Sequence, residues 1–79
     1  TSLHTLVQMV DNDLGVTLIP EMAVEAGLLN GTKVQARPLK AEHALREIAL
    51  VWRTNSPRRE EFQMLADAIR NLHEKKLPA

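Results

Sequence analysis

Cysteine is absent from this 79-residue sequence, which also has no net charge and no long apolar run. Without cysteine, these residues can form no disulfide, no thiolate zinc site and no thiol redox centre. Ten lysines and arginines balance ten aspartates and glutamates, so no net charge attracts the chain to nucleic acid or anionic lipid. The apolar runs are far shorter than the roughly 20 residues that span a bilayer, and no basic-then-apolar leader marks the chain for export. We therefore expect a cytoplasmic chain with no membrane partner.

Catalytic and metal-binding motifs are missing as well. His4, His43 and His73 lie far apart, and none has a second ligand at helical spacing, so we expect solvated or capping histidines rather than a metal site. Glu60 and Glu61 form the only adjacent acidic pair, in a predicted first helical turn where the helix dipole favours negative charge. No serine lies in a nucleophile-elbow pattern, and no glycine-rich loop could hold a phosphate. The sequence predicts no enzyme, no catalytic residue and no cofactor.

The first part of the chain predicts a helix followed by a short strand. Apolar residues recur at helical spacing and Ser2 can act as N-cap, which predicts a helix over Ser2–Asn12. The next run, Val16–Ile19, is apolar on both faces and lies between Gly15, which would close the helix, and Pro20. Such a run is typical of a buried parallel strand.

The middle of the chain predicts a short helix and two more strands. Glu21–Ala26 follows a proline, which would occupy the favoured first helical position. Val34–Pro38 alternates apolar and polar residues, but its proline cannot donate to a ladder, which indicates an edge strand. Ile48–Trp52 is the clearest strand, apolar on both faces. We expect the tryptophan in the core rather than at an interface.

The last element is a helix that starts with Ser56 as cap and Pro57 at the first helical position. Its apolar residues form one stripe at helical spacing: Phe62, Leu65, Ala66, Ile69 and Leu72. The predicted order is helix, strand, helix, strand, strand, helix, which favours an α/β sheet covered on both faces. Three short strands make a poor sheet of that kind. We therefore expect a piece cut from a longer protein, with further strands supplied by missing sequence or by copies of the chain.

Two groups of polar residues are candidates for contacts. Arg58 and Arg59 fall in a helix first turn, where the dipole disfavours cations. Either Arg58 pairs with Glu61, or the two arginines form a contact surface for a protein or domain; they are too few for DNA binding. At the other end of the sequence, Thr1 and Ser2 either cap the first helix or form a small anion or polar-ligand site with its free amides.

Taken in order, these motifs resemble a known family. Thr1–Val10 followed by Gly15–Pro20 resembles the helix–glycine–strand–proline pattern of LysR-type effector-binding domains. Arg46–Arg53, then Ser56–Arg58 and the apolar stripe from Phe62, resembles the end of the same domain. The resemblance covers nearly the whole chain, in register and without a large gap. Within the family, the motifs are most similar to the hydrogen-peroxide-sensing regulators of the OxyR type.

The resemblance implies a transcription regulator with an N-terminal winged helix-turn-helix and a regulatory domain of two α/β lobes, like the type II periplasmic binding proteins. Residues 1–45 would belong mainly to the second lobe, and residues 46–79 would supply the returning strand and last helix of the first lobe. The peroxide-sensing cysteines would precede this chain. DNA and RNA polymerase would be contacted only through the rest of the protein.

The resemblance also implies roles for particular residues. The first helix would begin at the interlobe cleft or the subunit contact, which makes Thr1 and Ser2 candidates for effector contact. Arg53 would lie near a surface used for assembly or polymerase contact, and Arg58 and Arg59 are further candidates there.

Two alternatives belong to other classes of protein. The chain could be the C-terminal part of a solute-binding protein for transport, or a free-standing module that buries its strands by dimerising. In the fragment interpretation, unpaired strand edges and apolar faces favour strand exchange. We therefore expect an intertwined homo-oligomer.

Overall fold

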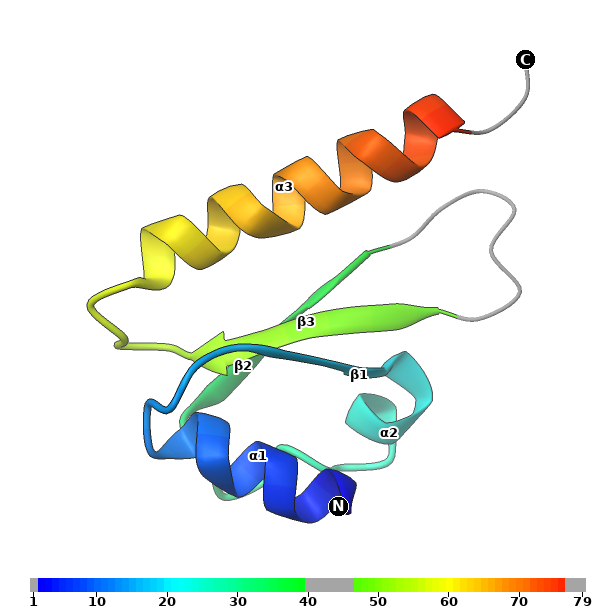
Figure 1. Ribbon diagram of the computed structural model, residues 1–79. Coiled ribbons are helices and arrows are strands. Elements are labelled where there is room, and N and C mark those ends of the chain that lie inside the picture. Colours follow the sequence, from blue (N-terminus) through cyan, green and yellow to red (C-terminus); the bar gives the residue numbers. More distant parts are fainter. Residues whose placement is uncertain (1, 40–46, 77–79) are drawn as a thin grey trace.

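Helices and strands follow one another in the order that the sequence predicts. The computed structural model describes residues 2–39 and 47–76, with side chains up to residue 71. Figure 1 shows the elements of this part of the chain. They are α1 (Leu3–Asp11), β1 (Thr17–Pro20), α2 (Glu21–Glu25), β2 (Val34–Pro38), β3 (Ile48–Arg53) and α3 (Arg59–Lys76).

The strands form one sheet in the order β1-β3-β2. Both outer strands run antiparallel to β3, with Thr17 opposite Val51 on one side and Gln35 opposite Trp52 on the other. The prediction of a parallel strand after α1 was therefore wrong. The strand is also less buried than predicted, since Ile19 is buried but Leu18 is 46% exposed. An apolar run carries no information about the direction of the neighbouring strand. The prediction that β2 is an edge strand is confirmed.

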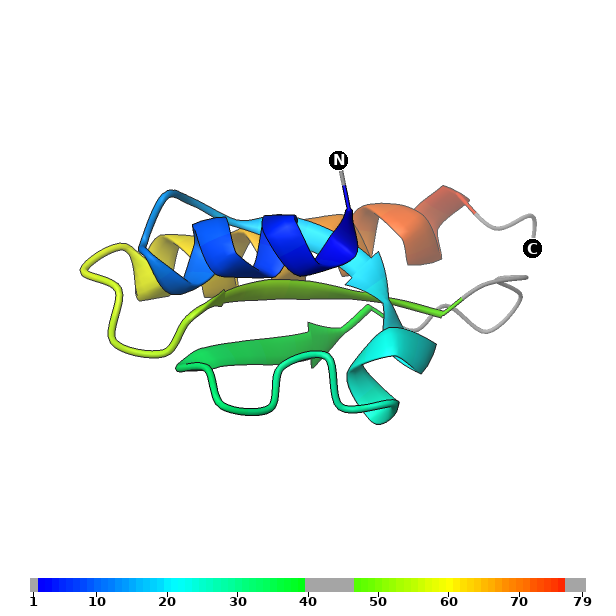
Figure 2. The same cartoon turned by 90° about the horizontal axis from the view of Figure 1, so that it is seen from below.

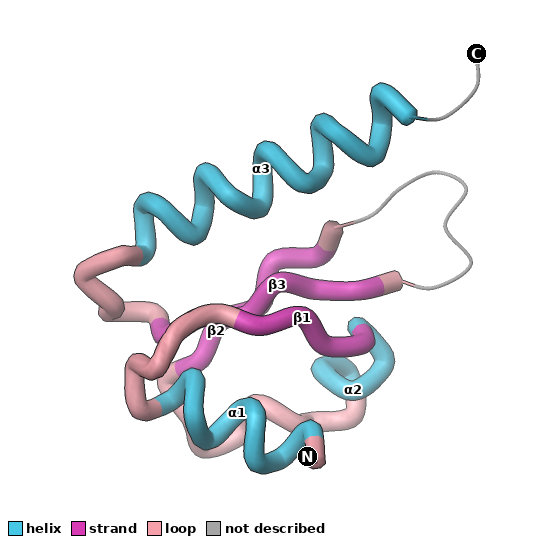
Figure 3. Tube along the Cα trace, in the orientation of Figure 1, coloured by secondary structure: helices cyan, strands magenta, loops and turns pink. Residues whose placement is uncertain are grey.

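Helices cover both faces of the sheet, as the sequence predicted. Figures 1 and 3 place α1 below the strands and α3 above them, and from below (Figure 2) α1 lies in front of the sheet and α3 behind it. The buried residues between α1 and the sheet are Val7, Val10, Ile19, Val34 and Val51. Those between α3 and the sheet are Leu39, Leu50, Trp52, Phe62 and Ala66. Trp52 has an exposed fraction of 0%, which confirms that it lies in the core.

Different interactions stabilise the two ends of the first helix. Ser2 caps its start, as predicted, and its last turn is closed by Asp13, which has a φ of 61°. The Asp13 amide donates to the Val10 carbonyl at 2.9 Å, and the Leu14 amide donates to the Met9 carbonyl at 3.1 Å. This pairing is typical of a helix that ends in a left-handed residue. The residue that closes the helix is therefore Asp13, two positions before the predicted Gly15.

The second helix begins at Glu21, as predicted, and the third begins two residues later than predicted. Pro20 is the last residue of β1 and the N-cap of α2, rather than its first helical residue. Similarly, α3 begins at Arg59, and Ser56 lies in the turn before it, where its Oγ accepts from the Arg58 amide at 3.2 Å. Of the predicted stripe, Phe62 and Ala66 are buried. Ile69 is half-buried, Leu65 is 41% exposed, and the side chain of Leu72 lies outside the described residues.

The central strand β3 joins both halves of the chain into one sheet. It pairs with β1 and β2 at once, and its four middle residues are buried. The predicted lobe boundary between residues 45 and 46 lies outside the described residues. The assignment of residues 1–45 and 46–79 to different lobes therefore stays a prediction.

Candidate functional site

Thr1 and Ser2 are the two residues predicted to contact an effector, and Ser2 lies at the start of α1. Ser2 is exposed, and its Oγ accepts a hydrogen bond from the Thr5 amide at 3.1 Å. The same oxygen shares a second hydrogen bond, of 2.9 Å, with Thr5 Oγ1. Thr1 lies outside the described residues. Ser2 therefore acts as a helix cap in this structure, and its contact with an effector stays a prediction.

The cap can be tested by replacing Ser2 with alanine. We expect the free energy of unfolding to fall by about 1 kcal/mol, because the Thr5 amide loses its acceptor. Ser2→Asp is the matched control, since aspartate restores an acceptor and places a negative charge at the positive end of the helix dipole. Urea denaturation followed by circular dichroism measures both changes. Equal stability of Ser2→Ala and wild type would show that the cap contributes nothing.

A second polar group, here called the Asp11 junction, consists of Asp11, Lys33, Arg53 and Asn55. Arg53 Nη1 donates to the Asp11 carbonyl at 2.8 Å, and the Lys33 amide donates to Asp11 Oδ1 at 2.9 Å. Arg53 Nε donates to Asn55 Oδ1, also at 2.8 Å. The junction therefore connects the end of α1, the residue before β2 and the end of β3.

The role of Arg53 follows from its position opposite the last residue of α1. Carbonyl groups at a helix C-terminus lack intrahelical donors and carry partial negative charge. The half-buried guanidinium of Arg53 supplies both a donor and a positive charge at this point. Sequence reasoning singled out Arg53 only through the family resemblance. It missed Asp11 entirely, because 42 positions separate the two residues and no local pattern connects them.

The arginine pair before α3 has local partners. Arg58 Nε donates to Glu61 Oε2 at 3.2 Å, and its guanidinium lies 5.2 Å from the centroid of the Phe62 ring. Arg59 Nη1 donates to the Ser56 carbonyl at 3.1 Å. The predicted pairing of Arg58 with Glu61 is therefore confirmed. Both arginines are exposed, so each can also contact another molecule, and that second role stays a prediction.

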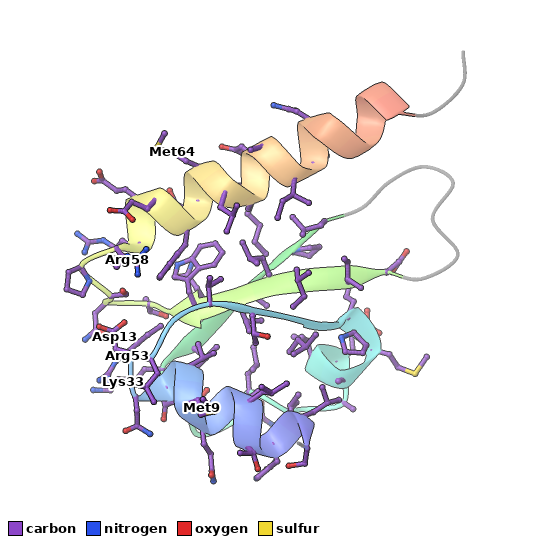
Figure 4. The ribbon with its side chains drawn as sticks, in the orientation of Figure 1. Met9, Asp13, Lys33, Arg53, Arg58 and Met64 are labelled. Carbon is purple, nitrogen blue, oxygen red and sulfur yellow. The ribbon has the colours of Figure 1, made fainter. Side chains whose placement is uncertain are left out.

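The candidates lie on two separate surfaces. Arg53 and Arg58 lie at the same end of the sheet, together with Lys33 and Asp13 (Figure 4). Ser2 lies at the opposite end of α1, because the nine residues of that helix span about 13 Å. An effector site at Ser2 and a contact surface at Arg53 would therefore act at a distance from each other.

Candidate metal clusters and membrane-spanning helices are both absent from the described residues. Within residues 2–39 and 47–76, no three histidine, cysteine, aspartate or glutamate side chains gather so that they could hold a metal ion. His43 and the side chain of His73 lie outside the described residues. No helix in the same part of the chain is long and apolar enough to cross a bilayer.

Comparison with known proteins gives a family and several relatives. The family model described as LysR substrate binding domain matches residues 1–74. A hydrogen peroxide-inducible genes activator of Dickeya chrysanthemi is 40% identical to this chain, and the alignment covers 100% of this chain and 27% of the length of that activator. The DNA-binding transcriptional dual regulator OxyR of Escherichia coli is 41% identical, and the alignment covers 89% of this chain and 23% of the length of that regulator.

A further relative carries a different name. The HTH-type transcriptional regulator EstR of Acinetobacter baylyi is 32% identical, and the alignment covers 91% of this chain and 24% of the length of EstR. The chain thus spans about a quarter of the length of the curated relatives that it matches.

Proposed function

Because the chain belongs to the LysR substrate-binding domain family, we propose that it is the C-terminal part of the effector-binding domain of a LysR-type transcription activator that responds to hydrogen peroxide. The family is a non-enzymatic one, as the sequence predicted. In this proposal the chain contributes to effector response and oligomerisation, and contacts with DNA and RNA polymerase are made in the cytoplasm by the whole protein.

The observation that carries the proposal is the similarity to activators that are named for hydrogen peroxide. The hydrogen peroxide-inducible genes activators of Dickeya chrysanthemi and Escherichia coli O6:H1 are 40% and 41% identical to this chain, and EstR is 32% identical. None of these three names describes a solute-binding transport protein. The chain contains no cysteine, so thiol chemistry in response to peroxide would belong to another part of the protein.

The two surfaces support separate tasks within such a domain. Thr1 and Ser2 would contact the effector at the cleft between two lobes, with residues 1–45 mainly in the second lobe and 46–79 returning to the first. Arg53, Arg58 and Arg59 would contact another subunit or the polymerase at the end of the sheet. The domain would act by holding lobes and subunits in one of two arrangements, which repositions DNA-binding domains elsewhere in the protein.

A chimaera with the Escherichia coli relative tests this function. The segment of that regulator that aligns with this chain is replaced by this chain, and a peroxide-inducible reporter is measured with and without hydrogen peroxide. We expect the chimaera to keep most of the induction, because the elements that pack against the rest of the domain are retained.

The matched control is a second chimaera that carries the aligned segment of EstR. It should fold, since both segments belong to one family, but it should lose peroxide induction. Loss of induction in both chimaeras, with both proteins folded and bound to DNA, would contradict the proposed peroxide response. Equal induction in both would show that the segment does not distinguish a peroxide-responsive regulator from another member of the family.

A further inference from the structure

Asn30 and Gly31 lie in the turn between α2 and β2. An asparagine followed by a glycine is typical of a turn, and both residues lie outside the helices and strands. Gly31 has a φ of 80°, which glycine adopts without strain. A Cβ added at Gly31 would meet no atom within 4 Å. The asparagine carboxamide is therefore followed directly by a backbone nitrogen that no side chain shields.

No hydrogen bond holds either of these two groups. In the part of the chain that the structure describes, the Gly31 N–H has no acceptor and the Asn30 carboxamide has no partner. The amides on either side are bonded: that of Asn30 donates to the Gly27 carbonyl at 3.0 Å, and that of Thr32 to the Leu29 carbonyl at 3.1 Å. The carboxamide lies against Gly27, where an added Cβ would come within 2.8 Å of Asn30 Nδ2. The carboxamide carbon and the Gly31 nitrogen can therefore approach each other without breaking a hydrogen bond.

The other asparagines of the chain are held more firmly. At Asn12 and at Asn55, the side chain and the amide of the next residue both form hydrogen bonds. These bonds join Asn12 Nδ2 to the Gln8 carbonyl (2.8 Å), Asp13 N–H to the Val10 carbonyl (2.9 Å), Arg53 Nε to Asn55 Oδ1 (2.8 Å) and Ser56 N–H to the Arg53 carbonyl (3.0 Å). Asn71 lies within α3, where helical hydrogen bonds hold the backbone. Asn30 is therefore the asparagine whose reaction the fold hinders least.

We propose that Asn30 is a site of spontaneous deamidation, with water as the co-reactant. The Gly31 nitrogen loses its proton and attacks Asn30 Cγ, the bond from Cγ to Nδ2 breaks, and ammonia leaves. The product is a cyclic succinimide. Water then opens the ring at either carbonyl, which gives aspartate or isoaspartate at this position. Both products add a negative charge, and isoaspartate also inserts a methylene group into the backbone.

The inserted methylene group would act on the core between α1 and the sheet. Leu28 and Leu29 pack against the buried cluster on that side. The Thr32 amide and its Oγ1 both donate to the Leu29 carbonyl, the latter at 2.6 Å. A longer backbone between Leu29 and Thr32 weakens both bonds. The isoaspartate form should therefore be less stable than the aspartate form, whose backbone is normal. The proposal does not depend on the response to peroxide.

The test follows deamidation of the folded chain over time, by peptide mapping with mass spectrometry. We expect Asn30 to react at least about ten-fold faster than Asn12 or Asn55, since each hydrogen bond that must open slows the reaction by up to about ten-fold. The rate at Asn30 should rise in proportion to the hydroxide concentration, because the Gly31 nitrogen must lose its proton. Chromatography should separate aspartate and isoaspartate forms of the same peptide.

The chain unfolded in urea separates the effect of the fold from that of the glycine. A following glycine favours the reaction at Asn30 in both states. Unfolding should speed the reaction at Asn12 and Asn55, whose hydrogen bonds are then lost, and should change the rate at Asn30 much less.

Three variants test the chemistry and its consequence. Gly31→Ala places a side chain beside the attacking nitrogen and should slow deamidation by about ten-fold or more, which corresponds to about 1.4 kcal/mol in the barrier. Asn30→Gln keeps a carboxamide but requires a larger ring, so the reaction at this position should nearly stop. Asn30→Asp is the matched control for stability, since it has the added charge with a normal backbone. Aged wild-type chain that contains isoaspartate should unfold at a lower urea concentration than Asn30→Asp.

Three results would overturn the proposal. The first is a folded chain in which Asn30 reacts no faster than Asn12 and Asn55. The second is a reaction that yields aspartate without isoaspartate, since direct hydrolysis of the carboxamide forms no succinimide. The third is an unfolded chain in which Asn30 is accelerated as much as Asn12 and Asn55. Should Gly31→Ala fail to fold, Asn30→Gln and the two products still decide the question.

Discussion

Replacing Trp52 with alanine is expected to lower the free energy of unfolding by about 3–5 kcal/mol, as for other large aromatic residues in cores. The indole is fully buried between the sheet and α3, and its ring centroid lies 6.3 Å from that of Phe62. Domains of this size rarely have more than about 3–5 kcal/mol of net stability, so the variant should be largely unfolded at 25 °C. Urea denaturation followed by circular dichroism measures the loss. An unchanged denaturation midpoint would show that the indole does not stabilise the fold.

Trp52→Phe is the matched control for this experiment. It keeps an aromatic ring in the core, and it removes the indole Nε1, which is buried without a hydrogen-bond partner among the described residues. A buried unpaired donor is unfavourable, so this variant should lose clearly less stability than Trp52→Ala. Trp52 is also the only tryptophan, so the fluorescence of the wild-type chain reports unfolding from within this core. A loss as large as that of Trp52→Ala would contradict this expectation.

Replacing Arg53 with alanine is expected to lower the free energy of unfolding by about 1–3 kcal/mol, the range for losing hydrogen bonds made by a charged group. The variant removes the donors to the Asp11 carbonyl and to Asn55 Oδ1, which separates the end of α1 from the end of β3. Arg53→Lys should lie between alanine and wild type, because a lysine keeps the charge but cannot donate to two acceptors in a fixed planar geometry. Chemical denaturation of the three proteins gives the order.

Arg58→Ala is the control for the junction. Its ion pair with Glu61 is exposed, with 66% and 67% of the two side chains accessible, and such pairs contribute little. If Arg53→Ala and Arg58→Ala were equally stable, the Asp11 junction would not stabilise the fold.

Arg53→Ala, introduced into the chimaera with the Escherichia coli relative, separates the structural role of Arg53 from its proposed contact with another subunit or the polymerase. At a temperature where Arg53→Ala is still folded, loss of reporter activation would support a contact with another subunit or the polymerase. Full activation in the folded variant would leave Arg53 with the structural role alone.

Local sequence patterns were sufficient for most of the secondary structure. Helical spacing and Ser2 predicted α1, and the apolar run Ile48–Trp52 predicted β3 to within one residue. The alternation and the proline of Val34–Pro38 predicted an edge strand. These features depend on neighbours within a few positions, so the sequence carries them directly. The predictions that Pro20 and Pro57 are first helical residues were wrong, because a proline can precede a helix as well as open it.

Local sequence patterns predicted only part of the candidate site. The pair of Arg58 with Glu61 could be predicted, since both residues lie on one helical turn. The Asp11 junction could not, because its members come from three elements that meet only when the sheet has formed.

By itself, the sequence determined the order of elements, the burial of Trp52, the absence of thiol chemistry and the family resemblance. Each of these follows from residue types and short spacings. Only the tertiary structure decided that β1 runs antiparallel to β3 and that Asp11 joins α1 to both β2 and β3. The physical reason is that strand direction and edge exposure depend on which segments pair across the sheet. The pairing of β1 with β3 joins residues that are 28 to 34 positions apart, and no local pattern encodes it.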